Sequence, residues 1–217
     1  MGKEDEMKIL VFGASGGTGR ELVTQALEQG HVVTAFLRDP VKMNDIQHAN
    51  LSLVSGDVLD PLAVANAVQG QEAVLVTIGA GPKRTTIREE GTRNVVNAMQ
   101  DSGVKRLLCM SSLGVGDSRS NLPFFTRYVV VGMFLRHAFA DHENQEIVVM
   151  NSTLDWTLVR PPHLKDGPHT GTYQHGFTVE TTYRDIEGWI SRSDVADFML
   201  KQLTDDTYVH DTPGVSY

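Results

Sequence analysis

The sequence has little of what marks secreted or membrane proteins. Its 217 residues include a single cysteine, Cys109, so no disulfide can form within the chain, which suits a reducing compartment. The apolar run LPFFTRYVVVGMFL, residues 122–135, is 14 residues long, whereas a transmembrane helix needs about 20. The amino-terminal segment MGKEDEMKILVF is acidic with only a short apolar run, unlike a signal peptide. We therefore expect a soluble cytoplasmic protein, with the run 122–135 forming a core helix, a pocket wall or a dimer face.

Positive charge is also scarce. The chain has 19 Lys and Arg against 27 Asp and Glu, and the net charge of −8 argues against general binding to nucleic acid or anionic membranes. His137 and His142 are five residues apart, and no H-x-x-x-H or Cys/His set occurs, so we expect no metal. No internal repeat, low-complexity tract or linker interrupts the chain. We expect one domain spanning residues 1–217 and a monomeric protein.

Short apolar runs alternate with helix-like segments along the chain. The strand-like runs are KILVFG, HVVTAFL, LSLVSGD, EAVLVTIG, KRLLCMSS and DWTLVRP. Continuous apolar strands separated by helices predict a parallel sheet covered on both faces, a doubly wound α/β Rossmann fold. Gly30, Gly70 and Gly103 each precede a strand and mark helix ends.

Two later segments carry more detailed predictions. In the helix from Thr85, an apolar stripe runs from Ile87 to Met99, and Arg88 is expected to point outward with its charged neighbours. After Pro161-Pro162 the chain becomes rich in Gly, Thr, Tyr and His, which predicts a loop and short strands over the carboxyl ends of the sheet. The segment SRSDVADFMLKQL then predicts a closing helix with Ser193 as its N-cap.

The segment VFGASGGTG fits two motifs. Gly13, Ser15 and Gly17 match G-x-S-x-G, in which Ser15 would be an esterase nucleophile; Gly13, Gly16 and Gly19 match a dinucleotide-binding loop. An esterase elbow needs an oxyanion N–H from an upstream strand, and only about a dozen residues precede this motif. Dinucleotide folds instead place the loop after their first strand. This position favours the dinucleotide interpretation.

In that interpretation each residue of the loop has a physical role. Gly13 permits a tight turn, Gly16 lets the backbone approach phosphate, and Gly19 lets the helix pack close to the strand. Ser15 and Thr18 are expected to donate hydrogen bonds to phosphate, and the helix amino terminus adds free N–H groups and partial positive charge.

The ends of the following strands predict the rest of a cofactor groove. In FLRDPVK, Arg38 and Lys42 would accommodate a 2′-phosphate. Asp39 could instead bind the ribose hydroxyls of NADH, so NADH remains an alternative. The two cations could also simply begin a solvated turn. The spacing favours NADPH over NADH. Asp57 and Val58 are expected beside the adenine, and Gly79 beside the ribose or pyrophosphate.

The motifs FGASGGTG, RDP, GDV, EGTRNVV, CMSS and VRPPHLKDGPHTGTY together resemble the atypical short-chain dehydrogenase/reductase group with an NAD(P)H-binding, NmrA-like fold. Within it, the flavin reductases, also called biliverdin-IXβ reductases, are most similar. The resemblance implies NADPH-dependent reduction of a small planar substrate, either a flavin such as FMN or riboflavin or a linear tetrapyrrole. It also implies a set of site residues: Gly13, Ser15, Gly16, Gly17 and Thr18 for the phosphates, Arg38 and Lys42 for the 2′-phosphate, Asp57 and Val58 for adenine, Ser111 and Pro162 on the cofactor side, and Ser112 and His163 as active-site residues. The segments GAGPKRTT and SLGVGDSRSNLPFFTRYVVVGMF depart from the family pattern, which weakens the inference about substrate.

The chain also lacks the Tyr-x-x-x-Lys pair of alcohol dehydrogenation, since Tyr128, Tyr173 and Tyr183 are each followed by another residue type at the fourth position. A flavin or bilin can take its proton from water. His163 could orient the substrate, donate a proton or only bridge loop backbone, and Ser112 could bind the nicotinamide or cap a helix. A non-catalytic NmrA-like redox sensor and a reductase for another acceptor, such as a quinone, are the alternatives.

Overall fold

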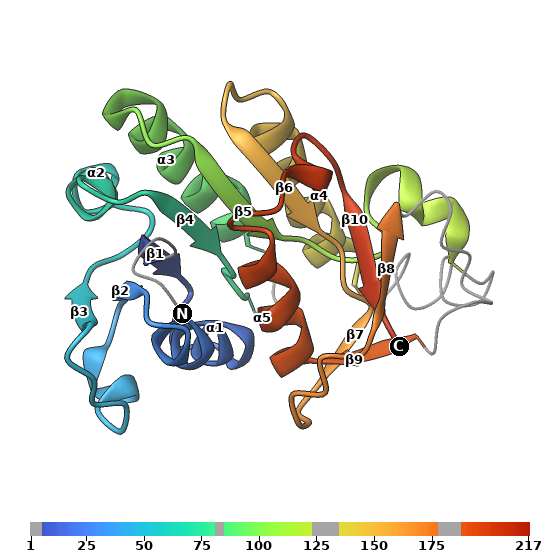
Figure 1. The fold of residues 1–217 in the computed structure, drawn as a ribbon. Helices are drawn as coiled ribbons and strands as arrows, with labels where there is room; N and C mark the ends of the chain where they lie inside the picture. The colour runs from blue at the N-terminus through green and yellow to red at the C-terminus, as the bar shows by residue number, and fades with distance from the viewer. Residues whose placement is uncertain (1–5, 81–84, 123–134, 178–187) are drawn as a thin grey trace.

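The computed structural model describes residues 6–80, 85–122, 135–177 and 188–217. Its centre is a six-stranded parallel sheet in the order β3-β2-β1-β4-β5-β6 (Figure 1). The strands are β1 (Lys8–Phe12), β2 (Val32–Leu37), β3 (Leu51–Ser55), β4 (Ala73–Val76), β5 (Arg106–Met110) and β6 (Asp155–Val159). The strand order reverses between β1 and β4, so a crevice is expected at the carboxyl ends of these strands. The predicted doubly wound α/β fold is confirmed.

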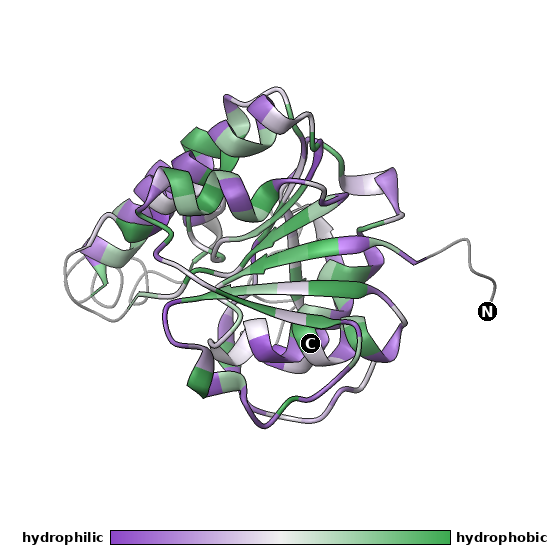
Figure 2. Ribbon diagram, turned by 90° about the vertical axis from the view of Figure 1, so that its left-hand side faces the viewer, coloured by the Kyte–Doolittle hydropathy of each residue, from purple (hydrophilic) through white to green (hydrophobic). Residues whose placement is uncertain are grey.

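Helices cover both faces of the sheet. On one face lie α1 (Gly17–Glu28) and α5 (Arg192–Lys201); on the other lie α2 (Pro61–Val68), α3 (Ile87–Ser102) and α4 (Arg136–Met150). In β1, Ile9 and Val11 pack toward α1 and α5, whereas Leu10 and Phe12 pack toward the other helices. This alternation follows the two-residue period of a strand, and it leaves the central strands hydrophobic throughout, as Figure 2 shows.

The carboxyl-terminal part adds two pairs of short strands. β7 (His163–Lys165) pairs in parallel with β9 (Trp189–Ser191), and β8 (Gln174–Phe177) pairs antiparallel with β10 (Pro213–Ser216). A bridge between Arg160 and Gly214 joins β10 to the chain just after β6. The small elaboration is therefore docked on the edge of the main sheet.

Helix ends bear out one sequence prediction and correct another. Gly30, Gly70 and Gly103 have φ angles of +91°, +75° and +80°, the left-handed conformation that favours glycine after a helix. The predicted N-cap of α5 is wrong, because Ser191 Oγ accepts the hydrogen bond from Asp194 N at 3.0 Å. Ser193 lies inside the helix and accepts a hydrogen bond from Gln25 Nε2 at 2.9 Å, which ties α5 to α1.

The outward orientation predicted for Arg88 is also wrong. Arg88 is 6% exposed, and its Nη1 lies 3.2 Å from Asp141 Oδ2. Asp141 on α4 also accepts hydrogen bonds from the backbone N–H groups of Arg88 and Glu89, so it caps the amino terminus of α3 from a distance. The position of a residue on a helical wheel cannot reveal a partner supplied by another helix.

Three further observations concern apolar segments. Cys109 is buried in β5, and burial raises the pKa of its thiol, which is typical of a packing residue. Among the described residues, no helix has the length and apolar character needed to cross a bilayer. Residues 123–134, most of the apolar run 122–135, lie outside the described residues.

Candidate functional site

A cleft of about 190 Å³ opens at the carboxyl ends of the central strands. Its walls come from the loops that follow β1, β2, β3 and β4 and from the start of α3. Most of the predicted cofactor residues line it, namely Gly13, Ser15, Gly16, Arg38, Asp57, Val58 and Gly79. The remaining lining residues were not predicted and are mostly apolar: Phe12, Phe36, Leu37, Gly56, Ile78 and Ile87. The structure thus gathers residues from four separate loops into the crevice that the strand order predicts.

The glycine loop at the floor of this cleft is sterically constrained. Gly13 has φ of +81°, and a Cβ there would lie 2.5 Å from the carbonyl oxygen of Thr77 on the neighbouring strand end. A Cβ on Gly19 would collide with the backbone of Gly13 and with Ala14 Cα, so the first turn of α1 rests directly on the loop. The tight turn and the close helix packing that the sequence predicts at Gly13 and Gly19 are both present.

The first turn of α1 is open to an anion. The helix has Gly16 as N-cap, no side-chain cap and no acidic residue in its first turn. Its first N–H groups therefore have no intrahelical acceptor, and the helix dipole adds positive potential there. Gly17 is exposed in this turn, whereas Thr18 is buried; neither lines the cleft itself. This cradle, in which any side chain on Gly13 or Gly19 would collide with backbone, fits the pyrophosphate of a dinucleotide.

The end of the cleft predicted to hold the adenine is fixed by close packing. Asp57 Oδ1 accepts a hydrogen bond from Leu59 N at 3.0 Å, which holds the turn after β3. The carbonyl of Val58 accepts a hydrogen bond from Asn94 Nδ2 at 3.0 Å, and a Cβ on Gly91 would lie only 2.8 Å from Val58 Cγ1. Gly91 and Asn94 belong to the motif EGTRNVV, which sequence analysis used only for the family resemblance. They let α3 pack against Val58 and hold this wall of the cleft.

The charges beside β2 distinguish Arg38 from its neighbours. Arg38 is exposed, lines the cleft and has no ion pair among the described residues. Asp39 Oδ1 instead accepts a hydrogen bond from Val41 N at 3.2 Å and caps the short 3-10 helix Pro40–Met43. Lys42 lies on that helix, exposed and outside the cleft lining. The cation is therefore available to a ligand, whereas the neighbouring carboxylate is engaged in its own turn.

Arg20 holds this 3-10 helix beside α1. Its Nη1 donates to the carbonyl of Lys42 at 2.6 Å, and its Nη2 is paired with Asp45. The hydrogen bond from Arg20 lowers the pKa of the Asp45 carboxyl. Arg20 therefore positions the segment that carries Lys42 without adding a free positive charge to the cleft.

The predicted cofactor residues Ser111 and Pro162 and the predicted active-site residues Ser112 and His163 all lie outside the lining of this cleft, on the segments after β5 and β6. Ser111 N donates to the carbonyl of Val159 at 2.8 Å and Leu113 N to that of Pro161 at 2.8 Å, so the two loops remain paired beyond the strands. Pro162 is half-buried directly after this pairing, and His163, which begins β7, is exposed.

The two serines differ in their hydrogen bonds. Ser112 Oγ donates to the carbonyl of Leu113 at 3.3 Å. Ser111 is 3% exposed, and its Oγ has no hydrogen-bond partner among the described residues. No hydrogen bond joins the side chains of Ser112 and His163 within the part of the chain that the structure describes. The two are held at one edge of the sheet as separate groups, not as a coupled pair.

Comparison with known proteins agrees with this cleft. Residues 13–206 match the NAD(P)H-binding family. The protein belongs to the NAD(P)H-binding family. It is 27% identical over 206 residues to the uncharacterized protein YwnB of Bacillus subtilis, an alignment that covers 91% of this chain and 92% of that one.

Solved structures share the fold of this NAD(P)H-binding protein. A short-chain dehydrogenase/reductase from Veillonella parvula, solved in complex with NADP, has a TM-score of 0.79 at 19% identity, covering 97% of this chain and 94% of that one. ChuY, an anaerobillin reductase from Escherichia coli O157:H7, has a TM-score of 0.79 at 23% identity and covers 96% of each chain. At these identities the likeness shows the Rossmann fold alone.

A buried arginine that the sequence did not single out supports the segment of this NAD(P)H-binding protein that leads to His163. Arg160, 1% exposed, donates through Nε and Nη2 to the two carboxylate oxygens of Glu146 at 2.8 and 2.6 Å. Its Nη1 donates to Asp117 Oδ1 at 2.5 Å. Arg160 immediately precedes Pro161-Pro162, so it joins α4, the 3-10 helix Gly116–Asn121 and the segment that leads to His163. An arginine after a buried strand signals a need for carboxylate partners, but the sequence does not identify them.

Proposed function

We propose that this protein is an NADPH-dependent reductase that transfers hydride to a flavin, such as FMN or riboflavin, or to a linear tetrapyrrole. The observation that carries the choice of NADPH is Arg38, which borders the cleft without an ion-pair partner in the described chain. The adjacent Asp39, which could otherwise favour the ribose hydroxyls of NADH, is already used as a helix cap.

The residues around the cleft would divide the cofactor between them. The pyrophosphate would be held by the glycine loop, namely Gly13, Ser15, Gly16, Gly17 and Thr18. The 2′-phosphate would lie on Arg38 and Lys42, and the adenine beside Asp57 and Val58. Gly79, which has no side chain, would let the ribose or pyrophosphate approach closely. A Cβ on Gly79, which lines the cleft, would meet no atom of the described residues within 4 Å, so there is open space beside it. When bound, the nicotinamide supplies the hydride.

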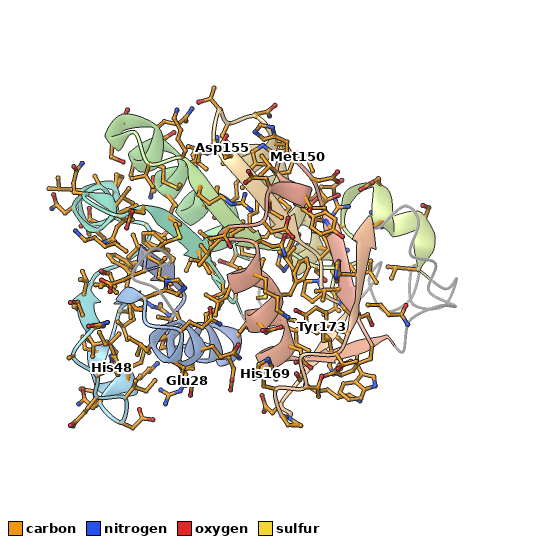
Figure 3. The ribbon with its side chains drawn as sticks, in the orientation of Figure 1. Glu28, His48, Met150, Asp155, His169 and Tyr173 are labelled. Carbon is orange, nitrogen blue, oxygen red and sulfur yellow. The ribbon has the colours of Figure 1, made fainter. Side chains whose placement is uncertain are left out.

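The protein's own residues favour an acceptor that needs no protein acid. No tyrosine has a lysine at the fourth following position. Tyr173 (labelled in Figure 3) donates its hydroxyl proton to Asp197 Oδ2 at 2.6 Å beside α5, and burial together with this carboxylate raises its pKa. Tyr128 and Tyr183 lie outside the described residues. The reduced flavin or bilin would take its proton from water, and Ser112 and His163 would orient it.

The acceptor class rests on the family resemblance and on the reductase among the structural neighbours. ChuY is named an anaerobillin reductase, and a bilin is a linear tetrapyrrole.

Stopped-flow oxidation of NADPH against FMN, riboflavin, biliverdin and quinones tests the proposal. We expect rapid loss of the 340 nm absorbance with a flavin or a bilin and slower loss with quinones. Tight NADPH binding without turnover on any acceptor would overturn the proposal that the protein is an enzyme and would favour a redox sensor. Turnover confined to quinones would overturn the acceptor class and leave the cofactor assignment standing.

A further inference from the structure

A second cation lies over the glycine loop, and it comes from the far end of the chain. Arg192 is the first residue of α5, and a Cβ added to Gly17 would lie 2.5 Å from Arg192 Cδ and 2.7 Å from its Nε. Gly17 does not have the positive φ that would itself require glycine. The missing side chain at Gly17 therefore makes room for Arg192 against the first turn of α1.

The guanidinium of Arg192 is oriented by one carboxylate. Its Nη1 lies 2.6 Å from Asp166 Oδ1, and the two side chains are 30% and 95% exposed. Nη1 is on the Cδ side of a guanidinium, so this contact leaves the opposite edge, formed by Nε and Nη2, for another ligand. Within the described chain that edge has no hydrogen-bond partner.

The position and the free edge together match one part of a dinucleotide. The uncapped first turn of α1 offers backbone N–H groups to an anion, and Arg192 reaches the same turn from α5. The paired N–H groups of an arginine fork match two phosphate oxygens, and the bond is strengthened by charge. Arg38 lines the cleft after β2, whereas Arg192 lies outside its lining, against Gly17, so the two arginines would bind different phosphates.

We infer that Arg192 is a further cofactor-binding residue, whose Nε–Nη2 edge donates to the pyrophosphate held on the glycine loop. This inference rests on the proposed function, because it requires that a dinucleotide occupies the cleft. The pyrophosphate is common to NADPH and NADH, so Arg192 strengthens the binding of both cofactors equally and leaves the choice between them to Arg38. Asp166, directly after β7, positions Arg192 and links the phosphate site to the segment that carries His163.

The test measures binding by calorimetric titration. Four proteins, namely the wild type, Arg192→Ala, Arg192→Lys and Arg38→Ala, are each titrated with NADPH, NADH and adenosine 2′-phosphate. Arg192→Ala should weaken NADPH and NADH alike, by roughly 10- to 100-fold. It should leave adenosine 2′-phosphate, which has no pyrophosphate, unchanged. Arg192→Lys keeps the positive charge and the aliphatic side chain over Gly17 but loses the paired N–H groups of the guanidinium. Its loss of affinity for NADPH and NADH should therefore be smaller than that of Arg192→Ala. Arg38→Ala should weaken the binding of NADPH and adenosine 2′-phosphate, which both carry a 2′-phosphate, and leave the binding of NADH unchanged.

Arg93→Ala is the matched control, because Arg93 is an exposed arginine on α3 paired with Glu89, outside the cleft lining. It should leave all affinities unchanged, and circular dichroism melting checks that each variant is folded. Unchanged affinities for NADPH and NADH in both Arg192 variants would overturn the inference about Arg192. A selective loss of NADPH affinity in Arg38→Ala would still support the cofactor assignment. A wild type that bound neither dinucleotide would overturn the proposed function itself.

Discussion

The proposed phosphate end of the site, residues 13–38, and the proposed acceptor end, residues 111–122 and 159–163, are held in place differently. At the phosphate end the positive φ of Gly13 and the close approach of Gly19 to the loop are backbone constraints. At the acceptor end the ion pairs of buried Arg160 with Glu146 and Asp117 add to the backbone hydrogen bonds between the two loops. A backbone cradle can bind the same cofactor whatever surrounds it, whereas loops held by side chains can change with the substrate.

Removing the buried arginine tests the acceptor end most severely. Arg160→Ala leaves the Glu146 carboxylate buried without its bidentate partner, and we expect a loss of about 3–5 kcal/mol in the free energy of unfolding. Urea unfolding measures this loss. Asp117→Ala is the control, because that side chain is 53% exposed, and it should cost less than about 1 kcal/mol. Similar losses in the two variants would show that the Arg160–Glu146 pair is not the main tie.

Substitutions at two glycines of the cleft should affect stability and NADPH binding differently. Gly13→Ala meets both a positive φ and the carbonyl of Thr77, so we expect a loss of about 1–3 kcal/mol in stability together with weak NADPH binding. Gly79→Ala meets no atom of the described residues within 4 Å, so stability should change by less than about 0.5 kcal/mol while NADPH binding weakens. Thermal melts and NADPH titrations measure both. If Gly79→Ala bound NADPH normally, the ligand would not pass beside residue 79.

The next largest effect is expected at the free cation. Arg38→Ala should raise the KM for NADPH by about 10- to 100-fold and leave that for NADH nearly unchanged, because a charge-assisted hydrogen bond to the 2′-phosphate is lost. Steady-state kinetics with each cofactor measure the ratio. Lys42→Ala should have a smaller effect, since Lys42 does not line the cleft. Equal changes for the two cofactors would contradict the assignment of Arg38.

The helix interface beside the acceptor end should respond to acid. Burial, with the nearby Arg88 charge, lowers the pKa of His142 to about 3. Its proton is therefore bound more readily in the unfolded chain, and stability should fall as the pH drops below the unfolded pKa of about 6.5. At pH 5 the loss should be about 1–2 kcal/mol, and His142→Gln should remove most of it. An unchanged pH dependence of urea unfolding in this variant would exclude His142 as the cause.

The smallest effect concerns Gly17. Alanine there should displace Arg192 and cost stability in the wild-type background, although glycine is otherwise the poorer helix former. In an Arg192→Ala background the same change should be neutral or stabilising by up to about 1 kcal/mol. A double-mutant cycle of thermal unfolding measures this difference. Additive effects would mean that Arg192 does not depend on the space above Gly17.

The features that sequence could predict are those set by neighbours along the chain. The strand runs, the glycine loop and the helix-ending glycines follow from local composition, and strand order then brings Gly13, Arg38, Asp57 and Gly79 to one cleft. Here a few residues determine both the local structure and the site.

The features that sequence missed depend on partners far along the chain. Arg88 seemed an outward charge on an amphipathic helix, but Asp141 on α4 buries it. Arg192 and Gly17 are far apart in sequence and meet only because α5 packs on α1. Tertiary contacts of this kind leave no periodicity in the sequence, so the buried ion pairs and the second arginine emerge only from the structure.

The central claim, that the cleft binds NADPH through the glycine loop and Arg38, is tested most directly by calorimetric titration of the wild-type protein with NADPH and NADH. The account predicts one NADPH per chain, bound at least about tenfold more tightly than NADH. Equal affinity for the two cofactors, or no binding of either, would contradict it.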